Sequence, residues 1–186
     1  MLAADRFGLI GIPMVEVELL ASFDCGKPHL NDFLRQDALA LSERRLGFTS
    51  VVFHEDVDGV VGYFTLANDG LPLTNSECFS LGLSDHAALT SFPAVKIGRL
   101  AIRKELQGQG VGHHILNLIQ GLALDSGSPV ASRLIVVDAD NEERVLHFYE
   151  SAGFQRSLWS ENRVKHHGGR GRPATVKMHR DVLAPG

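Results

Sequence analysis

The middle of the chain combines four sequence patterns in an order that few folds accommodate. Residues 94–102 are largely apolar and predict a buried strand, and a glycine-rich turn follows at residues 107–112. Apolar side chains then recur at helical spacing, and residues 133–137 form a second apolar run that predicts a strand covered on both faces. A strand, a helix and a strand in this order make a βαβ unit with parallel strands and a right-handed crossover. The apolar helical positions are Val111, Ile115, Leu118, Ile119 and Leu122.

The sequence before this unit predicts a helix and an antiparallel hairpin. Residues 15–20 are expected to be extended, and a helix follows in which apolar residues recur every three or four positions. Residues 48–54 and 60–67 are rich in β-branched and aromatic side chains, so we expect two strands joined by a turn at Asp58-Gly59. The apolar positions of the helix are Leu30, Phe33, Leu34, Ala38 and Leu41.

The remaining segments complete a mixed domain. Residues 68–93 carry turn residues without a clean period and predict mostly loop, with one helical turn at most. Asn141 opens a short helix that runs through Glu150 and ends at Gly153, and a last strand is expected at residues 175–180. The expected fold class is therefore α/β (α+β), with a mixed, mostly antiparallel sheet around the central parallel βαβ unit and with flanking helices.

Composition indicates one domain over residues 1–186. The chain has 186 residues, of which 44% are hydrophobic, and a chain of this length buries about 70% of its unfolded surface without help from a disulfide or a metal. Cys25 and Cys78 lie far apart and outside any metal-ligand spacing, so we expect buried, reduced thiols in a cytoplasmic protein. No segment resembles a signal peptide or a membrane span, so we expect neither a metal nor a membrane partner.

An uneven charge distribution sets the end of the chain apart. Residues 1–154 carry 11 basic and 20 acidic side chains, a net charge of −9, whereas residues 155–186 carry 7 basic and 2 acidic side chains, a net charge of +5. This basic C-terminal tail either meets a phosphate-bearing partner or forms a solvated loop and strand, and its composition favours neither. Its basic residues are Arg156, Arg163, Lys165, Arg170, Arg172, Lys177 and Arg180.

The glycine-rich turn has the composition of an anion site. A helix N-terminus presents backbone N–H groups without intrahelical acceptors and the positive end of the helix dipole. Gly108, Gly110 and Gly112 let the backbone approach phosphate oxygens closely, although the same residues would also serve as a plain connection. No lysine stands where a P-loop requires one, and His113 occupies the place of the third glycine of a dinucleotide fingerprint. Both of those nucleotide-binding motifs are therefore excluded.

Two blocks of the sequence carry a family pattern. The first, residues 97–117, contains Gln107, Gly110 and Gly112 at the matching positions of the pattern Gln/Arg-x-x-Gly-x-Gly/Ala. The second, residues 141–154, contains the order Phe-Tyr-x-x-x-Gly-Phe. The blocks stand about thirty residues apart, which is the separation that one crossover connection requires. Together they resemble the acyl-CoA segments of the GNAT superfamily of N-acetyltransferases.

This resemblance implies a role for each matched segment. Backbone groups at the end of the first strand would bind the pantetheine arm of acetyl-CoA, the glycine-rich turn would hold its pyrophosphate, and Asn141 would bind the pantetheine region. Tyr149 would lie near the CoA sulfur as the catalytic residue. The residues implied in acetyl-CoA binding are Leu100, Ala101, Ile102, Gln107, Gly108, Gln109, Gly110, Val111, Gly112 and Asn141.

Acetyl transfer to an amine needs a neutral nucleophile, a stabilised tetrahedral intermediate and a proton for the leaving thiolate. The Tyr149 phenol can donate that proton, because an ordinary phenol has a pKa of about 10; as a core residue it would simply pack beside Phe148 and Phe154. A backbone N–H of Ala101 or Ile102 is expected to stabilise the oxyanion. The general base stays open among Glu105, Asp138, Asp140, His113 and His114.

The N-terminal half carries a further resemblance. Residues 23–26, 30–34 and 62–66 look like the corresponding segments of the GNAT toxins of bacterial toxin–antitoxin pairs, so the resemblance touches most of residues 20–156. It implies the amino group of aminoacyl-tRNA as the acceptor and a ribbon-helix-helix antitoxin as a partner. RNA binding would then rest on the basic C-terminal tail together with scattered arginines.

Two other classes of function stay open at this point. The chain would also suit an acetyltransferase of a small amine or a protein amine, or a non-catalytic acyl-CoA-binding module on the same fold. Tyr149 separates the enzymes from the binding module, because a pure binder has no need of an acid. The expected partners are acetyl-CoA and an amine acceptor, and the sequence leaves open whether the chain forms a homodimer.

Overall fold

The computed structural model describes residues 2–86, 89–125, 127, 131–166 and 172–184. The chain divides into two compact units. Unit 1 comprises Met1–Ala67 and Ile97–Leu118, and unit 2 comprises Asn68–Lys96 and Ile119–Gly186. Among the described residues, no helix is both long and apolar enough to cross a membrane.

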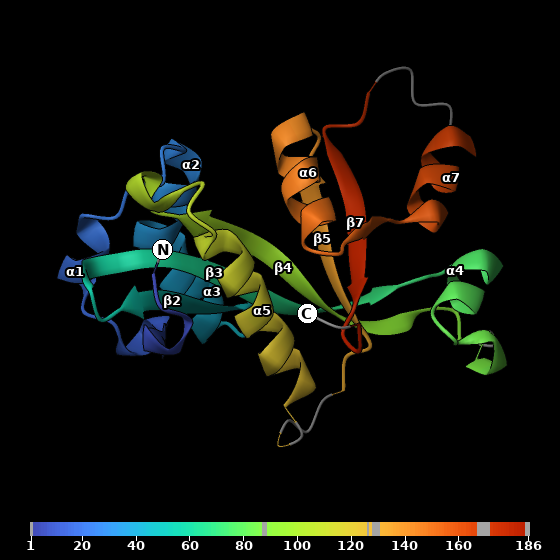
Figure 1. Cartoon of the computed structure of the whole chain (residues 1–186), viewed down its shortest axis with the longest axis horizontal. Helices are drawn as coiled ribbons and strands as arrows, with labels where there is room; N and C mark the ends of the chain where they lie inside the picture. The colour runs from blue at the N-terminus through green and yellow to red at the C-terminus, as the bar shows by residue number, and fades with distance from the viewer. Residues whose placement is uncertain (1, 87–88, 126, 128–130, 167–171, 185–186) are drawn as a thin grey trace. The chain divides into compact units, whose positions relative to one another are not determined.

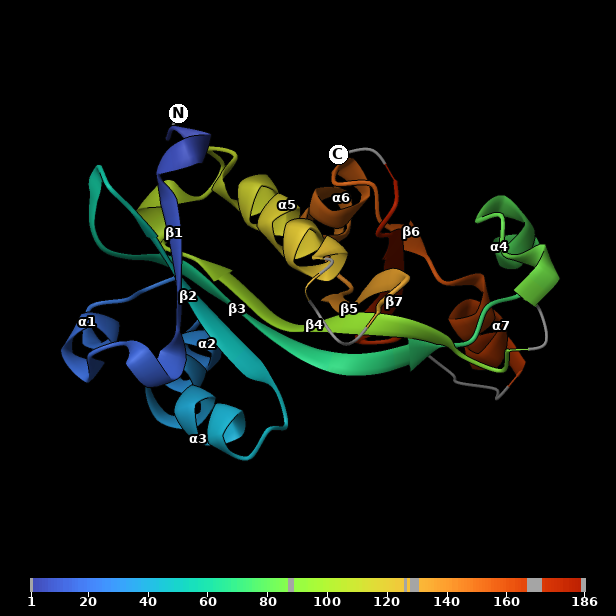
Figure 2. The same ribbon diagram turned by 90° about the horizontal axis from the view of Figure 1, so that it is seen from below.

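The described strands form one seven-stranded sheet. Its strand order is β1-β2-β3-β4-β5-β7-β6, in which β4 and β5 are parallel neighbours. Helix α5 (Val111–Leu124) connects β4 (Phe92–Ile102) to β5 (Leu134–Asp140), as Figures 1 and 2 show. The predicted βαβ unit and the mixed, mostly antiparallel sheet are therefore confirmed.

Unit 1 begins with an edge strand that the sequence pattern hides. Strand β1 (Phe7–Gly11) pairs antiparallel with β2 (Phe48–His54), and Gly8 and Gly11 interrupt its apolar pattern. The extended segment expected at residues 15–20 is wrong, because a short helix occupies it. That helix has one buried residue, Leu20, which is too little burial to leave a helical period in the sequence. The flanking helices are η1 (Ala4–Arg6), η2 (Ile12–Met14) and α1 (Val17–Ala21).

The helix predicted around residue 34 forms in three continuous pieces. They are α2 (Pro28–Asp32), the π-helical turn η3 (Phe33–Asp37) and α3 (Ala38–Glu43). Pro28 stands in the first turn, where its missing N–H removes no helical hydrogen bond. Figure 2 shows these helices on one side of β2 and β3 and the α5 helix on the other side.

The predicted hairpin is present, but its turn lies elsewhere. Strand β2 pairs antiparallel with β3 (Val57–Leu71), and the register shifts between Val52 and His54 before closing at His54↔Val57. The turn is therefore formed by Glu55 and Asp56, so the turn expected at Asp58-Gly59 is wrong. Gly59 instead lies inside β3 with a φ of 75°, a backbone conformation that favours glycine.

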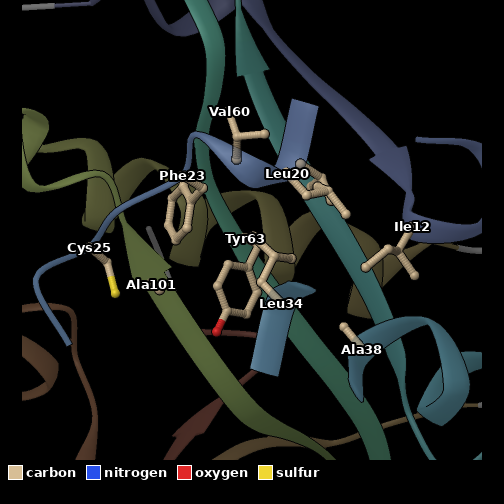
Figure 3. Close-up of a cluster of buried hydrophobic side chains, with 10 residues drawn as sticks. Ile12, Leu20, Phe23, Cys25, Leu34, Ala38, Val60, Tyr63 and Ala101 are labelled. Atoms are coloured by element: carbon tan, nitrogen blue, oxygen red, sulfur yellow. The ribbon is translucent and has the colours of Figure 1, made fainter. Parts of the chain in front are cut away.

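The core of unit 1 lies between its N-terminal helices and the sheet. Tyr63 is fully buried there; its ring meets Phe23 edge-on at 5.6 Å, and its hydroxyl donates to the Leu30 carbonyl at 2.8 Å. Gly62 faces the other way, where a Cβ would come within 2.7 Å of the Ala101 carbonyl oxygen. Figure 3 shows this cluster, which comprises Ile12, Leu20, Phe23, Cys25, Leu34, Ala38, Val51, Val60, Tyr63 and Ala101.

Unit 2 is built around the antiparallel pair of β5 and β7 (Thr175–Asp181). A short strand, β6 (Gln155–Arg156), adds to the other edge of β7, and helix α6 (Glu143–Ser151) packs on β5. The last strand and the helix that opens near Asn141 are confirmed. The buried apolar side chains of unit 2 form a second cluster, which comprises Leu71, Cys78, Leu83, Phe92, Ala94, Leu134 and Val136.

Two segments of unit 2 differ from the expectation. The stretch 68–93 is not mostly loop, because it contains the end of β3, helix α4 (Asn75–Ser80), the turn η4 (Ser84–His86) and the start of β4. The basic C-terminal tail begins with strand β6 and helix α7 (Leu158–His166) rather than with a loop. None of the α7 side chains is buried, so this helix leaves no apolar period in the sequence.

The buried carboxylate of Glu77 caps two helices of unit 2. Its Oε2 accepts hydrogen bonds from the backbone N–H and the hydroxyl of Thr74 (2.7 and 2.8 Å), which starts α4. Its Oε1 accepts the backbone N–H of Leu158 at 2.8 Å, the first residue of α7, and lies 3.4 Å from His179 Nε2. Burial lowers the pKa of His179 even though Glu77 acts in the opposite direction.

Replacing Glu77 with Ala is expected to lower the free energy of unfolding by about 3 kcal/mol, because two helix-capping N–H groups lose their buried acceptor. Urea unfolding followed by circular dichroism measures this loss. Glu77→Gln is the matched control, since it keeps one acceptor oxygen and should cost clearly less. Equal losses in the two variants would contradict the capping role.

Candidate active site

The glycine-rich turn of unit 1 has the backbone that its glycines predict. It follows the short helix η5 (Lys104–Leu106), and Gly108 and Gly110 have φ values of 75° and 85°. Other residues adopt this left-handed region only under strain. A Cβ built at either glycine meets no atom within 4 Å, so the space over the turn is open.

Helix α5 begins directly after this turn. The backbone N–H of His114 donates to the Gly110 carbonyl at 3.1 Å, so the N–H groups of Val111 and Gly112 precede the first hydrogen bond of the helix. These two N–H groups and the positive end of the helix dipole lie beside the open space over Gly110. The turn therefore has the features that a pyrophosphate group requires.

The two glutamine side chains of the turn hold its shape. Gln107 Nε2 donates to the carbonyl oxygens of Cys25 (2.9 Å) and Ile102 (3.0 Å), which ties the turn to the end of β4. Gln109 Nε2 donates to the Glu105 carbonyl at 2.7 Å. Because both amides are engaged with the protein backbone, the turn is suited to bind an anion through main-chain N–H groups rather than through these side chains.

A polar segment at residues 24–31, which includes the start of α2, positions the Cys25 carbonyl that accepts from Gln107. Asn31 is buried; its Oδ1 accepts the backbone N–H and the thiol of Cys25, and its Nδ2 donates to Asp24 at 2.7 Å. Hydrogen bonds from the Gly26 backbone and from Asn31 lower the pKa of Asp24. Sequence reasoning noted this segment as a family resemblance and missed its structural role, which is to fix the Cys25 carbonyl.

The end of β4 is held firmly in unit 1. Ala101 is buried in the core, and Leu100 and Ile102 are half-buried. Just beyond them, the backbone N–H of Arg103 donates to Val61, and its guanidinium donates to two more carbonyl oxygens of β3. The predicted contact of Leu100, Ala101 and Ile102 with a pantetheine arm stays a prediction, and it would be made by a strand with a fixed backbone.

Tyr149 lies in unit 2, on helix α6. It is 6% exposed, and its ring meets those of Phe148 and Phe154 edge-on, at 5.0 and 5.3 Å between centroids. Its hydroxyl forms no hydrogen bond with another described residue. Burial, reinforced by the negative charge of Asp140, raises the pKa of Tyr149, so the phenol keeps its proton at neutral pH. Tyr149 is thus a protonated donor without a partner in the described part of the chain.

Asn141 stands at the end of β5 and is engaged by the segment before β7. Its Nδ2 donates to the Pro173 carbonyl at 2.8 Å, and its Oδ1 accepts from Arg172 at 2.7 Å. Its backbone N–H donates to the Ala174 carbonyl at 2.9 Å. A contact of Asn141 with acetyl-CoA stays a prediction. Such a contact would require the Asn141 side chain to give up one of these hydrogen bonds.

The candidates for the general base differ in their surroundings. Burial alone would raise the pKa of Asp138, but ion pairs with Lys96 and Lys177 lower it, so this carboxylate is a weak proton acceptor. His114 stacks on Phe7 at 4.2 Å, and burial, with a smaller contribution from nearby His54, lowers its pKa.

The three other base candidates are side chains at the surface: Glu105, His113 and Asp140. In the part of the chain that the structure describes, no group of three or more His, Cys, Asp or Glu residues is placed to hold a metal ion.

This chain is similar to known acetyltransferases in sequence. The family described as "Acetyltransferase (GNAT) domain" matches residues 47–156. A tRNA-acetylating toxin of Mycobacterium tuberculosis (strain ATCC 25618 / H37Rv) is 30% identical over 125 residues, which cover 67% of this chain and 71% of that protein.

Solved structures share the fold of this chain. A crystal structure of a KacT mutant has a TM-score of 0.66 at 20% identity and covers 95% of both chains. AtaT complexed with acetyl-methionyl-tRNAfMet has a TM-score of 0.66 at 21% identity and covers 94% of both chains. The family match spans more than half of the residues, including the glycine-rich turn and Tyr149. The chain therefore belongs to the GNAT acetyltransferase family and is an acetyl-CoA-dependent N-acetyltransferase.

Proposed function

We propose that this enzyme acetylates the amino group of aminoacyl-tRNA and acts as the toxin of a bacterial toxin–antitoxin pair. The observation that carries the proposal is the 30% identity to a tRNA-acetylating toxin over 125 residues. The fold that the chain shares with AtaT, which was solved with acetyl-methionyl-tRNAfMet, supports it.

In this proposal, residues 1–186 form a single GNAT acyltransferase domain. The N–H groups of the glycine-rich turn, residues 107–112, hold the pyrophosphate of acetyl-CoA, and the backbone at residues 100–102 binds its pantetheine arm. Asn141 adds a polar contact to the same arm. Acetyl-CoA supplies the activated acetyl group.

Tyr149 holds the proton that the thiolate needs on leaving. Its raised pKa keeps the hydroxyl protonated at neutral pH, which is the state an acid must have, although the same shift makes the phenol a weaker acid than an ordinary tyrosine. The Phe148 and Phe154 rings pack edge-on against the phenol ring and fix its orientation. After proton transfer, the resulting phenolate is destabilised by burial and by Asp140, so it regains a proton readily.

An antitoxin is part of this proposal. AtaT has been solved bound to the C-terminus of the antitoxin AtaR and acetyl-CoA, and an AtaT–AtaR complex has been solved with DNA. We infer a ribbon-helix-helix antitoxin for this chain as well, a cytoplasmic location where charged tRNA is present, and a homodimer as its assembly.

Expression of the chain in bacteria tests the proposal. We expect growth arrest on induction, because acetylated aminoacyl-tRNA cannot serve in elongation. Tyr149→Phe and Gly110→Val should relieve the arrest if they accumulate to the same level as the wild-type chain. Arrest by the wild type that persists in both variants would contradict a toxicity that depends on acetyl transfer.

A second candidate is acetylation of a small amine or a protein amine. The net charge of −9 over residues 1–154 favours it, because an acidic surface repels RNA. Wild-type expression without growth arrest, together with acetylation of a small amine, would select this candidate.

A further inference from the structure

The structure separates the basic residues of the C-terminal tail into two groups. Lys177 lies in ion pairs with Asp138 and Asp69, and Arg180 is buried and donates to Gln120 at 2.8 Å. Both side chains are therefore engaged with other residues of unit 2, Lys177 half-buried and Arg180 buried. The others described are at the surface: Arg156, Arg163, Lys165 and Arg172. Arg170 lies outside the described residues.

Two of the surface residues, Arg163 and Lys165, are on helix α7. The start of this helix is fixed by Glu77, which accepts the Leu158 N–H, and by fully buried Ser157, whose Oγ accepts the N–H of Ser160. Both views place α7 beside α4 and away from α6 (Figures 1 and 2). The basic residues stand in the last turn of α7, so an anchored helix presents them to solvent.

An aromatic ring lies on the same helix. Arg163 is four residues after Trp159, and its guanidinium carbon lies 5.2 Å from the centre of the indole ring. Trp159 is half-buried, which fixes the ring and leaves part of it accessible. A planar guanidinium stacked on an indole is a surface on which unpaired nucleobases stack, with the positive charge placed to meet the adjoining phosphates.

We propose that α7 is the surface that binds unpaired nucleotides of the RNA acceptor, with Trp159 and Arg163 as the stacking platform and Lys165 as a phosphate contact. This inference rests on the proposed function. Charge complementarity favours an RNA occupant, because the surface of the tail carries four described basic side chains, whereas its two acidic side chains are Glu161 and Asp181, of which Asp181 is paired with Arg133. A protein partner on α7 is the alternative, and unchanged RNA affinity in the α7 variants would favour it.

The experiment measures the affinity of the full-length chain for deacylated tRNA and for a short single-stranded RNA as salt is varied. Trp159→Leu keeps an apolar side chain but removes the stacking face, and should weaken binding about tenfold. The double variant Arg163→Gln/Lys165→Gln should lower affinity and reduce the salt slope by about 0.7 for each phosphate that is no longer neutralised. A matched control, Arg6→Gln/Arg144→Gln, removes the same charge from two exposed positions outside the basic C-terminal tail and should change neither quantity.

Two results would overturn the inference. They are unchanged affinity and salt slope in both α7 variants, and an equal loss in the control. Thermal unfolding checks that each variant is folded, and the double variant decides if Trp159→Leu is not. Acetylation of aminoacyl-tRNA by the wild-type chain is measured alongside, because its absence overturns the proposed function, whereas its presence with unchanged α7 variants overturns this inference alone.

Discussion

Replacing Tyr149 with Phe is expected to lower kcat by about a hundredfold while the affinity for acetyl-CoA stays nearly constant. The substitution removes one hydroxyl and keeps the ring that packs against Phe148 and Phe154. The proton of that hydroxyl matters mainly as the thiolate departs, so the loss should appear in the chemical step. The expected effect is at the low end for a positioned acid because a thiolate is already a fair leaving group.

Steady-state kinetics and calorimetry with acetyl-CoA measure the two quantities for this variant. Thermal unfolding is the control: the Tyr149 hydroxyl has no hydrogen-bond partner among the described residues, so the variant should unfold near the wild-type temperature. A folded variant with wild-type kcat, under conditions where chemistry limits turnover, would remove Tyr149 from the mechanism. Water or another side chain would then be the acid.

The second large effect is expected at Gly110, where replacement by Val should abolish binding of acetyl-CoA. The native φ of 85° is strained for a β-branched residue. The side chain would also enter the open space over the turn, since a Cβ there meets no atom within 4 Å. That space lies beside the N–H groups of Val111 and Gly112, which we assign to the pyrophosphate. Calorimetric titration with acetyl-CoA measures the loss.

Gly82→Val provides the matched control for this variant. Gly82 also has a positive φ, of 65°, and a Cβ there also meets no atom within 4 Å, but it lies in the turn after α4. Both substitutions therefore impose a similar backbone strain. We expect Gly82→Val to lower stability and keep its affinity for acetyl-CoA. If both folded variants keep the wild-type affinity for acetyl-CoA, the glycine-rich turn does not hold the pyrophosphate.

The βαβ unit and its glycine-rich turn could be predicted from sequence because each of their elements has a pattern within its own residues. Helix α5 buries Val111, Ile115 and Ile119 of its predicted apolar positions, whereas Leu118 is half-buried and Leu122 is 44% exposed. The left-handed conformations of Gly108 and Gly110 explain why glycine stands at those positions. Strand β5 is buried along most of its length, which gives the continuous apolar run. Each of these signals comes from adjacent residues.

The elements that the sequence did not reveal depend on distant contacts. The bulge between Val52 and His54 moves the hairpin turn away from Asp58-Gly59. Helix α7 buries no side chain of its own and is capped by Glu77, which lies 81 residues earlier in the chain. The hydrophobic pattern of residues 158–166 therefore gives no sign of a helix that is stabilised by a distant capping residue.

In the candidate site, too, some features follow from local motifs and others from distant contacts. The positions of Gln107 and Tyr149 follow from motifs, but their surroundings do not. The hydrogen bond of Gln107 to the Cys25 carbonyl joins residues that are 82 positions apart. The ion pairs that make Asp138 a weak proton acceptor come from β4 and β7. Sequence pattern therefore identified residue types suited to the reaction, whereas the state of each side chain depends on the tertiary structure.

Transfer of labelled acetyl from acetyl-CoA to aminoacyl-tRNA tests the central claim most directly. The purified chain is incubated with acetyl-CoA labelled in the acetyl group and, in parallel, with charged tRNA, deacylated tRNA, bacterial protein and small amines. We predict that the label enters charged tRNA alone, is released by mild alkali as an N-acetylated amino acid, and is lost with Tyr149→Phe. Label in protein or small amines, with none in charged tRNA, would contradict the proposal.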